Sequence, residues 1–351
     1  MIPLFKPYMP DKLPELNDIL HSGALSYGKW GHRLEEKLSS FLNANNLLLT
    51  GSYASAIQIV LTTLNLQYGD EVIASPMCCL ASVMPLLTFG LKVVWADIDP
   101  STGTLSPDSV RDKITTKSKL IVHNHFCGYV GYVDEINTIG RNFDIPIIDD
   151  CVEAYGTKYK GNYTGNIGTD ISIFSFQTVR LPNTIDGGCI VFKDKGLYEK
   201  AILIRDFGIR RYMFRDDIGE ISSNCDIYMK GYSGTLNEVN SYIGCCQMKN
   251  ISKLLSKQRA NANCWDDKFS NTEFQIMGRK EIVPNYWVYG ILSKNKKKDI
   301  ETFRNKGFYA SSVHLPNSYY SIYGIQRPLY GVEDFYSKFI ALPCGWWFDN
   351  K

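Results

Sequence analysis

Short runs of apolar residues alternate with longer amphipathic stretches from about residue 44 onward. The runs NNLLLTG, DEVIASP and LKVVWADID are separated by helix-like segments such as SYASAIQIVLTTLNL. Strands that are apolar along their whole length are typical of a parallel sheet covered by helices on both faces. The later runs that we predict to be strands of this sheet are LIVHNHF, IPIIDDC, DISIFSF and GGCIVFKD. The pattern therefore predicts an α/β fold with a mostly parallel central sheet.

The pattern changes beyond Lys195, where helical periodicity replaces the alternation. The stretch from Leu236 to Phe269 is amphipathic and long enough to connect two domains. From about residue 275 the chain is richer in aromatic, lysine and turn-forming residues. We therefore expect a large α/β domain over residues 1–245 and a smaller α+β domain over residues 246–351.

The charges of the chain are nearly balanced. Its 351 residues include 38 Lys and Arg and 36 Asp and Glu, which gives a formal net charge of +2. This balance gives no electrostatic reason to expect nucleic acid or an anionic membrane as a partner. The lysine-rich stretch KNKKKD is expected to be a solvated loop. No apolar run is long enough for a membrane-spanning helix, so no membrane partner is expected.

Ten cysteines are present, none of them in a CxxC pair, and most lie in apolar segments such as YIGCCQM. The N-terminal segment MIPLFKPYMPDKLPEL does not have the pattern of a signal peptide. We therefore expect buried free thiols in a reducing compartment, and a cytoplasmic protein.

Polar residues follow several predicted strands, at the edge of an open parallel sheet where ligands gather. Gly51 and Ser52 lie between the first strand and a helix, where N–H groups and a hydroxyl could hold a phosphate, although such a pair is more often an ordinary turn. Asp149 and Asp150 end the strand IPIIDD, and adjacent strand residues face opposite sides of a sheet, so the two do not form a catalytic pair. Either one could keep a pyridine nitrogen protonated or could simply cap the strand.

His123 and His125 lie on the same face of a predicted strand. They could share a metal ion, but an HxH pair alone is unspecific, and no Cys or carboxylate stands at a matching local spacing. We therefore expect no metal site.

The segment IFSFQTVRLPNTIDGG resembles the FSF…K…GEGG signature of the DegT/DnrJ/EryC1/StrS family of pyridoxal-phosphate sugar aminotransferases. The block IPIIDDCVEAYGTKYKGNYTGNIGTDISIFSF resembles the EDAAQA…FSF block of that family, and further similar segments extend the resemblance from about residue 2 to 348. The resemblance implies a type I aminotransferase fold, with a homodimer in which each active site is completed by the neighbouring subunit. It also implies pyridoxal phosphate (PLP) or pyridoxamine phosphate (PMP) as cofactor and a nucleotide-linked sugar as substrate.

The resemblance also assigns roles to single residues. Asp150 would pair with the pyridine nitrogen of the cofactor, and Glu153 takes the position of a Gln or His that contacts the ring hydroxyl. Gln177 lies at a position after the FSF motif that is often His. The phosphate would be held by Gly51, Ser52 and Ser175, and by Ser233 at the position of an Asn from the neighbouring subunit.

Besides Gln177, further positions depart from the family pattern. Arg180 stands where the family has the lysine that forms the Schiff base, and a guanidinium is neither an imine-forming nucleophile nor a general base at physiological pH. Cys78 takes the place of the aromatic residue that stacks on the cofactor, and Asp186 replaces the Glu of GEGG.

Two kinds of function follow from these residues. In the first, PLP or PMP is bound without an internal lysine aldimine, and the chain performs amino transfer or dehydration on a nucleotide-linked keto-sugar, with Glu153 or His125 moving protons. In the second, the chain is a non-catalytic homologue or partner subunit that binds a sugar nucleotide, or a cofactor-free enzyme in which Arg180 binds the substrate. Either would place the protein in surface-polysaccharide (O-antigen) or deoxysugar biosynthesis.

Overall fold

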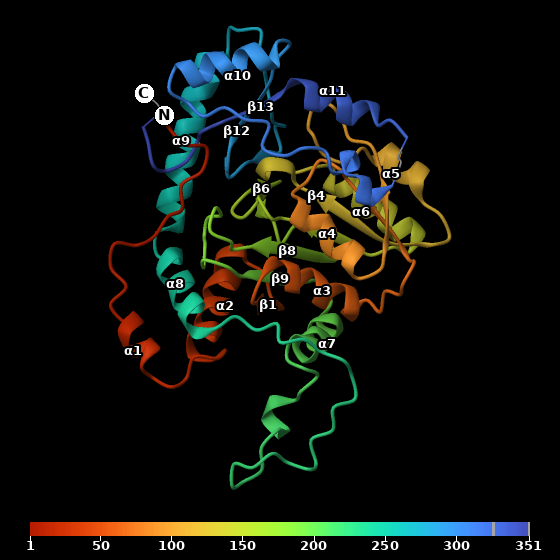
Figure 1. Cartoon of the computed structure of the whole chain (residues 1–351), viewed down its shortest axis with the longest axis vertical. Coiled ribbons are helices and arrows are strands. Elements are labelled where there is room, and N and C mark those ends of the chain that lie inside the picture. The colour runs from red at the N-terminus through yellow and green to blue at the C-terminus, as the bar shows by residue number, and fades with distance from the viewer. Residues whose placement is uncertain (325–326, 350–351) are drawn as a thin grey trace.

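The computed structural model of the chain describes residues 1–324 and 327–349. Its centre is a seven-stranded sheet with the strand order β1-β9-β8-β5-β4-β2-β3 (Figure 1). Every neighbouring pair in this sheet is parallel except the two pairs that contain β9. The mostly parallel α/β sheet predicted from the apolar runs is confirmed. Its strands are β1 (Leu47–Thr50), β2 (Glu71–Ala74), β3 (Lys92–Trp95), β4 (Ser118–Asn124), β5 (Ile147–Asp150), β8 (Ile171–Ser175) and β9 (Gly188–Phe192).

Both faces of this sheet are apolar because helices cover both. Ile148 faces a core formed with α3, α4 and α7, whereas Ile147 on the same strand faces a core formed with α5 and α6. The strands near β1 pack their second face against α2 and α8. These helices are α2 (Lys29–Leu42), α3 (Tyr53–Thr63), α4 (Leu80–Thr88), α5 (Pro107–Lys113), α6 (Val133–Phe143), α7 (Lys195–Arg205) and α8 (Glu238–Met248).

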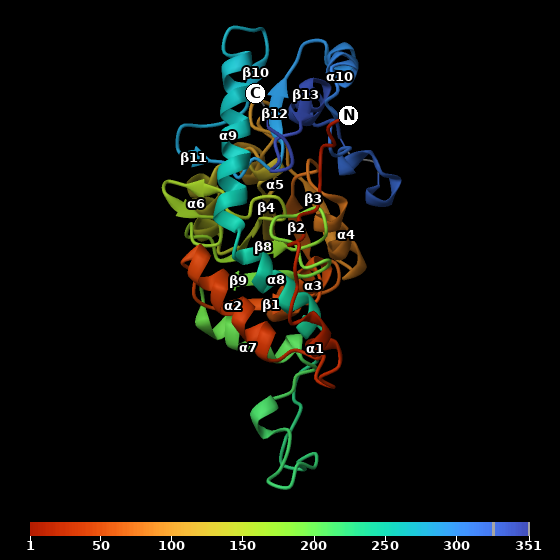
Figure 2. The same ribbon diagram turned by 90° about the vertical axis from the view of Figure 1, so that its left-hand side faces the viewer.

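A second, three-stranded sheet lies at one end of the molecule, with the order β10-β12-β13. Figure 2 shows α9 running lengthwise from α8 to this sheet. The expected domain boundary after residue 245 falls inside α8, and the division into two domains stays a prediction. The elements of this end are α9 (Ile251–Phe269), β10 (Gln275–Ile276), β12 (Tyr289–Leu292), α10 (Lys296–Asn305), α11 (Tyr330–Lys338) and β13 (Phe339–Leu342).

A third small sheet links the loop after β5 to the chain beyond α9, because β6 from that loop pairs with β11. The remaining short elements are α1 (Leu16–Leu20), η1 (Phe126–Gly128), β6 (Lys158–Tyr159), β7 (Asn162–Tyr163), η2 (Arg211–Met213), β11 (Ile282–Val283), η3 (Asn317–Tyr319) and η4 (Ser321–Tyr323).

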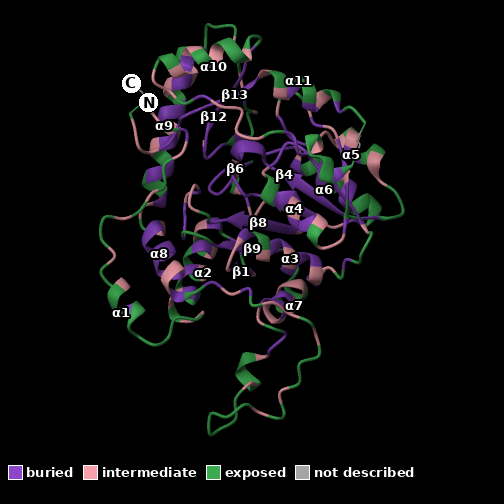
Figure 3. Ribbon diagram, viewed as in Figure 1, coloured by how far each residue is buried: buried purple, intermediate pink, exposed green. Residues whose placement is uncertain are grey.

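The segment between α7 and α8 projects from the body at the end opposite the second sheet (Figures 1 and 2). We call residues 207–232 the projecting segment. Figure 3 shows that most of it is exposed, and its apolar side chains include Tyr212 and Ile218, each 83% exposed. Exposed apolar side chains that gather in one segment are typical of an interaction surface.

All ten cysteines are free thiols, as predicted. Seven of them are buried, and the other three are partly exposed. Within residues 1–324 and 327–349, no helix has the length and apolar character needed to cross a membrane.

Candidate active site at the carboxyl edge of the sheet

The site lies where β5 and β8 end and where β1 leads into α3. Ser52 is the N-cap of α3, and its hydroxyl accepts a hydrogen bond from the backbone N–H of Ser55 at 3.1 Å. A serine at this position satisfies one of the free N–H groups of a helix start, which is why the sequence begins the helix here. Ser175 is the last residue of β8 and is buried, with its hydroxyl accepting from the N–H of Gln177 at 3.3 Å.

Asp150 is fully buried at the end of β5 and holds three donors. The hydroxyl of Tyr53 donates to its Oδ1 at 2.6 Å, and the backbone N–H of Val152 donates to the same oxygen at 3.2 Å. The side-chain amide of Asn124 donates to Oδ2 at 2.8 Å. Asp149 faces the other side of the sheet, as the strand alternation predicted.

Arg180 lies in the loop between β8 and β9, and its side chain is only 8% exposed. Its Nη1 is 3.5 Å from Oε1 of Glu153, and its guanidinium stacks 4.3 Å from the ring centroid of Trp287. Beyond this pair, a cavity of about 10 Å³ borders Arg180 on the Trp287 side, which is room for about one water molecule. Its Nε is buried without a hydrogen-bond partner among residues 1–324 and 327–349.

Glu153 joins Arg180 to a histidine. Its side chain is fully buried in the turn after β5, where Oε2 accepts the N–H of Cys127 at 2.7 Å and Oε1 lies 2.7 Å from Nε2 of His314. Burial alone raises the pKa of Glu153, but the charge and hydrogen bond of His314 and the charge of Arg180 outweigh it and hold the pKa below its ordinary value. Glu153 is therefore held as a carboxylate between Arg180 and His314.

His314 is the residue of this cluster that sequence reasoning missed. It comes from the loop before η3, in the segment HLPNSY, and its side chain is 16% exposed. The segment resembles a terminal element of the family, but the 161 positions between His314 and Glu153 gave no sign that the two side chains meet.

His125, the other candidate for moving protons, does not lie in this cluster. Its ring is fully buried on the opposite face of the sheet, where Nε2 lies 3.5 Å from Oδ1 of Asp149. His123 shares that oxygen, with Nδ1 at 3.1 Å. The neighbouring strand therefore supplies the carboxylate that the local sequence lacks.

These two histidines and Asp149 could hold a metal ion by proximity, since their ligand atoms lie within 4.8 Å of one another. The only hydrogen bond within this trio, among residues 1–324 and 327–349, joins Nδ1 of His123 to Oδ1 of Asp149. The backbone N–H of Gly131 donates to Nδ1 of His125 at 3.4 Å, whereas Nε2 of both histidines and Oδ2 of Asp149 have no hydrogen-bond partner in that part of the chain. The absence of a metal site stays a prediction.

The remaining predicted residues lie around the start of α3 or at the rim of the site. The N–H of Gly51 donates to the carbonyl of Gly234 at 2.8 Å, so Ser233 of the same chain lies beside the expected phosphate position. Gln177, Asp186 and Ser233 are exposed. Cys78 is buried, and the side-chain amide of Asn317 donates to its carbonyl at 2.9 Å.

The two ends of this site differ in how well they suit PLP or PMP. The start of α3 with the hydroxyls of Ser52 and Ser175 suits a phosphate. The other end does not fit the cofactor, because Asp150 already holds Tyr53 and Asn124, and the imine position carries Arg180 paired with Glu153.

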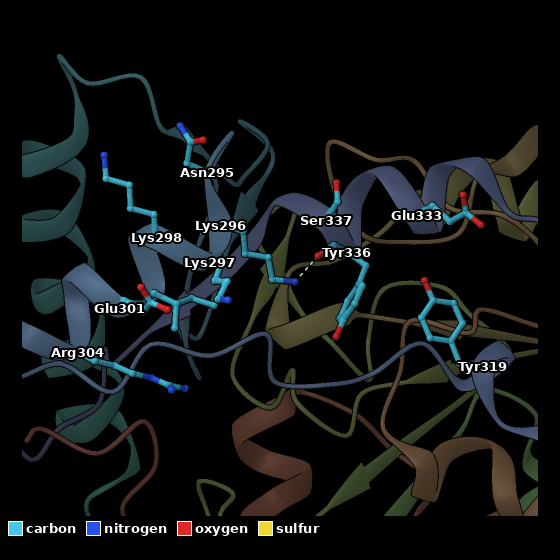
Figure 4. A pocket seen from close by; sticks show the side chains of 11 residues that line it. Asn295, Lys296, Lys297, Lys298, Glu301, Arg304, Tyr319, Glu333, Tyr336 and Ser337 are labelled. Carbon is cyan, nitrogen blue, oxygen red and sulfur yellow. Dashed lines mark hydrogen bonds between the residues drawn. The ribbon is translucent and has the colours of Figure 1, made fainter.

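A larger cavity of about 980 Å³ lies near the second sheet, between α10 and α11. Lys296 to Lys298 begin α10, so the stretch KNKKKD is not the solvated loop we predicted. Figure 4 shows Lys296 reaching from α10 to Tyr336, whose carbonyl accepts its hydrogen bond. Burial lowers the pKa of Lys296 to about 8.

Comparison with known proteins agrees with the geometry. The model of the DegT/DnrJ/EryC1/StrS aminotransferase family matches residues 9–349. GDP-perosamine synthase of Escherichia coli O157:H7 is 26% identical over 353 residues, which cover 98% of this chain and 91% of that protein. The sugar aminotransferase CalS13 from Micromonospora echinospora superposes with a TM-score of 0.92 at 24% identity, over 99% of this chain and 96% of that one.

Spr1654 from Streptococcus pneumoniae, solved in a PLP form and a PMP form, is a further structural neighbour. Its PLP form superposes with a TM-score of 0.87 at 21% identity, over 97% of this chain and 94% of that one. These similarities confirm the type I aminotransferase fold expected from the sequence.

Proposed function

The chain belongs to the DegT/DnrJ/EryC1/StrS aminotransferase family, and from this premise we propose that it binds a nucleotide-linked keto-sugar and moves a proton on the sugar without a lysine-bound cofactor. The observation that carries the proposal is the buried cluster of Arg180, Glu153 and His314 at the position of the missing lysine. The substrate class is supported by GDP-perosamine synthase among the relatives.

The cluster suits proton transfer next to a carbonyl group. A histidine held by a buried carboxylate is an oriented acid–base group, and His314 reaches solvent while Glu153 does not. The fixed positive charge of Arg180 would stabilise the oxygen that becomes an enolate when a neighbouring C–H proton is removed. His314 takes that proton and returns it, so the reaction class is isomerisation or epimerisation of the keto-sugar.

A second candidate rests on the start of α3. Because that end still suits a phosphate, PLP or PMP could be held there non-covalently, and the chain would then serve amino transfer or dehydration in surface-polysaccharide or deoxysugar biosynthesis. The chemistry that the cofactor supplies is an electron sink for a carbanion.

We also propose a cytoplasmic homodimer. The ten free cysteines support a reducing compartment. The exposed apolar side chains of the projecting segment support contact with a second copy. If the chain proves inactive alone, the same surface supports the alternative that the chain is a non-catalytic partner subunit and binds the sugar nucleotide.

The test is exchange of substrate C–H for deuterium. We expect GDP- or UDP-linked keto-sugars to bind by calorimetry and to take up deuterium from D₂O next to the keto group, measured by NMR. His314→Gln should lower exchange at least 100-fold, the usual range for a lost acid–base group, while binding persists. The exposed His21→Gln is the matched control. Binding by neither class of keto-sugar would overturn the proposal.

A further inference from the structure

Tyr53 connects the two ends of the candidate site. It is the first residue of α3, directly after Ser52, and its side chain runs inward until its hydroxyl reaches Asp150. The hydroxyl also lies 3.4 Å from the hydroxyl of Ser82 on α4. The whole residue is buried, with 5% exposure. Tyr53 therefore fills the space between the helix start and the end of β5.

The family's cofactor would need the same space between the start of α3 and the end of β5. A phosphate at the start of α3 and a pyridine nitrogen at Asp150 are the two ends of one rigid aromatic ligand. Tyr53 begins at the first point and ends at the second, with an aromatic ring of similar size between them. A pyridine ring can take this path only after the phenol leaves it.

Most of the hydrogen-bonding capacity of Asp150, the residue that would hold the pyridine nitrogen, is also in use. An ionised carboxylate has about four acceptor positions, and Asp150 accepts from Tyr53, Asn124 and the N–H of Val152 while being 0% exposed. Burial and the charge of Asp150 raise the pKa of Tyr53 well above its ordinary value, so the phenol keeps the proton that it donates. The phenol of Tyr53 therefore remains a hydrogen-bond donor to Asp150 at physiological pH.

The side of the expected cofactor position that Cys78 occupies is also filled by protein contacts. Cys78, at the position of the stacking aromatic residue, is 2% exposed and is held by Asn317 through both its carbonyl and its sulfur. The side-chain amide that fixes it comes from η3, 239 positions away. This side is therefore built from protein contacts that leave Cys78 no free face.

We propose that Tyr53 is a built-in occupant of the cofactor ring position, so that this family member works without resident PLP or PMP. This decides between the two candidates above in favour of the cofactor-free one. It does not depend on which sugar is bound, because cofactor binding is measured with no sugar present.

The experiment titrates the purified full chain with PLP and with PMP and follows absorbance, thermal stabilisation and retention on gel filtration. The variants are Tyr53→Ala, Tyr53→Phe, Arg180→Lys and the double change Tyr53→Ala with Arg180→Lys. Borohydride reduction and peptide mapping then locate any covalent adduct.

We expect no saturable binding by the wild type, by Tyr53→Phe, which keeps the ring, or by Arg180→Lys. Tyr53→Ala should bind one cofactor per chain non-covalently, and the double variant should give a reducible adduct mapped to position 180. Saturable binding by the wild type, or an adduct at position 180 with Arg180→Lys alone, would overturn the proposal. Those two results need no variant at Tyr53, so a poorly folded Tyr53→Ala leaves the test intact.

Discussion

Nη1 of Arg180 lies 3.5 Å from Oε1 of Glu153, and both side chains are almost wholly buried. The sequence resemblance implies a lysine and a Gln or His at these two positions, and this chain has an ion pair there instead. Each charge compensates the other in a place where either alone would be costly. The pair replaces a reactive amine by a fixed charge arrangement.

Removing one member of this pair should destabilise the fold. Arg180→Met leaves Glu153 with His314 alone, and Glu153→Gln leaves the guanidinium without its counter-charge, so each should lower the free energy of unfolding by about 3 kcal/mol. The double variant should lose at least about 1 kcal/mol less than the sum. Urea unfolding measures all three.

The control for that cycle is an exposed ion pair. Lys160 lies 2.6 Å from Asp134, with both side chains half exposed, and Lys160→Met should cost less than about 1 kcal/mol. Strictly additive losses for Arg180 and Glu153 would show that the two charges do not stabilise each other.

Stability should fall on mild acidification because of His123. Burial lowers the pKa of its imidazole, and the hydrogen bond to Asp149 offsets this only in part, with the like charge of His125 adding to the lowering. Below about pH 6.5, His123 therefore binds a proton more readily in the unfolded chain than in the folded chain. The free energy of unfolding should drop by up to about 1.4 kcal/mol per pH unit below that value.

His123→Gln should flatten this part of the pH profile, measured by urea unfolding between pH 7 and pH 5. The exposed His21→Gln should leave the slope as it is in the wild type. An unchanged slope in His123→Gln would contradict the assignment.

Lys296 should be the most reactive of the three lysines that begin α10. With a pKa of about 8 it is half neutral at pH 8, whereas an ordinary lysine is almost fully protonated there. We expect acetic anhydride at pH 8 to modify Lys296 several-fold faster than the exposed Lys297 and Lys298, as measured by peptide mass spectrometry. The advantage should shrink as the pH approaches 10, and equal rates at pH 8 would refute it.

The projecting segment should govern the oligomeric state. The proposed dimer has twice the chain mass of 39.8 kDa, and light scattering measures it directly. Tyr212→Asp with Ile218→Asp places charges on its exposed apolar side chains and should weaken the dimer at least tenfold. Tyr68→Asp, at an exposed site on the body, should change nothing, and a wild-type monomer would refute the proposal.

The sequence predicted the elements and faces of the sheet well. Apolar runs located the strands, and the alternation along IPIIDD correctly assigned Asp149 and Asp150 to opposite faces. The position of Arg180 at the lysine site followed from the similarity of a continuous segment. These features depend on local order, which one sequence contains.

Partners across the fold could not be predicted in the same way. Tyr53 and Asp150 are 97 positions apart, and His314 and Glu153 are 161 apart, so only tertiary packing brings them together. A periodic pattern tells which face a side chain occupies but not which side chain meets it there. For the same reason the sequence did not show that His125, one of the two candidates for moving protons, lies at Asp149 on the other face of the sheet.

The alternation along β5 has an evolutionary consequence. Asp149 belongs to a network with His123 and His125 behind the sheet, while Asp150, one peptide bond away, faces the reaction side. Substitutions on the reaction side therefore leave the network behind the sheet unchanged. Residues that face one side of β5 can thus change while the layer on its other side, which helps to fold the chain, is inherited unchanged.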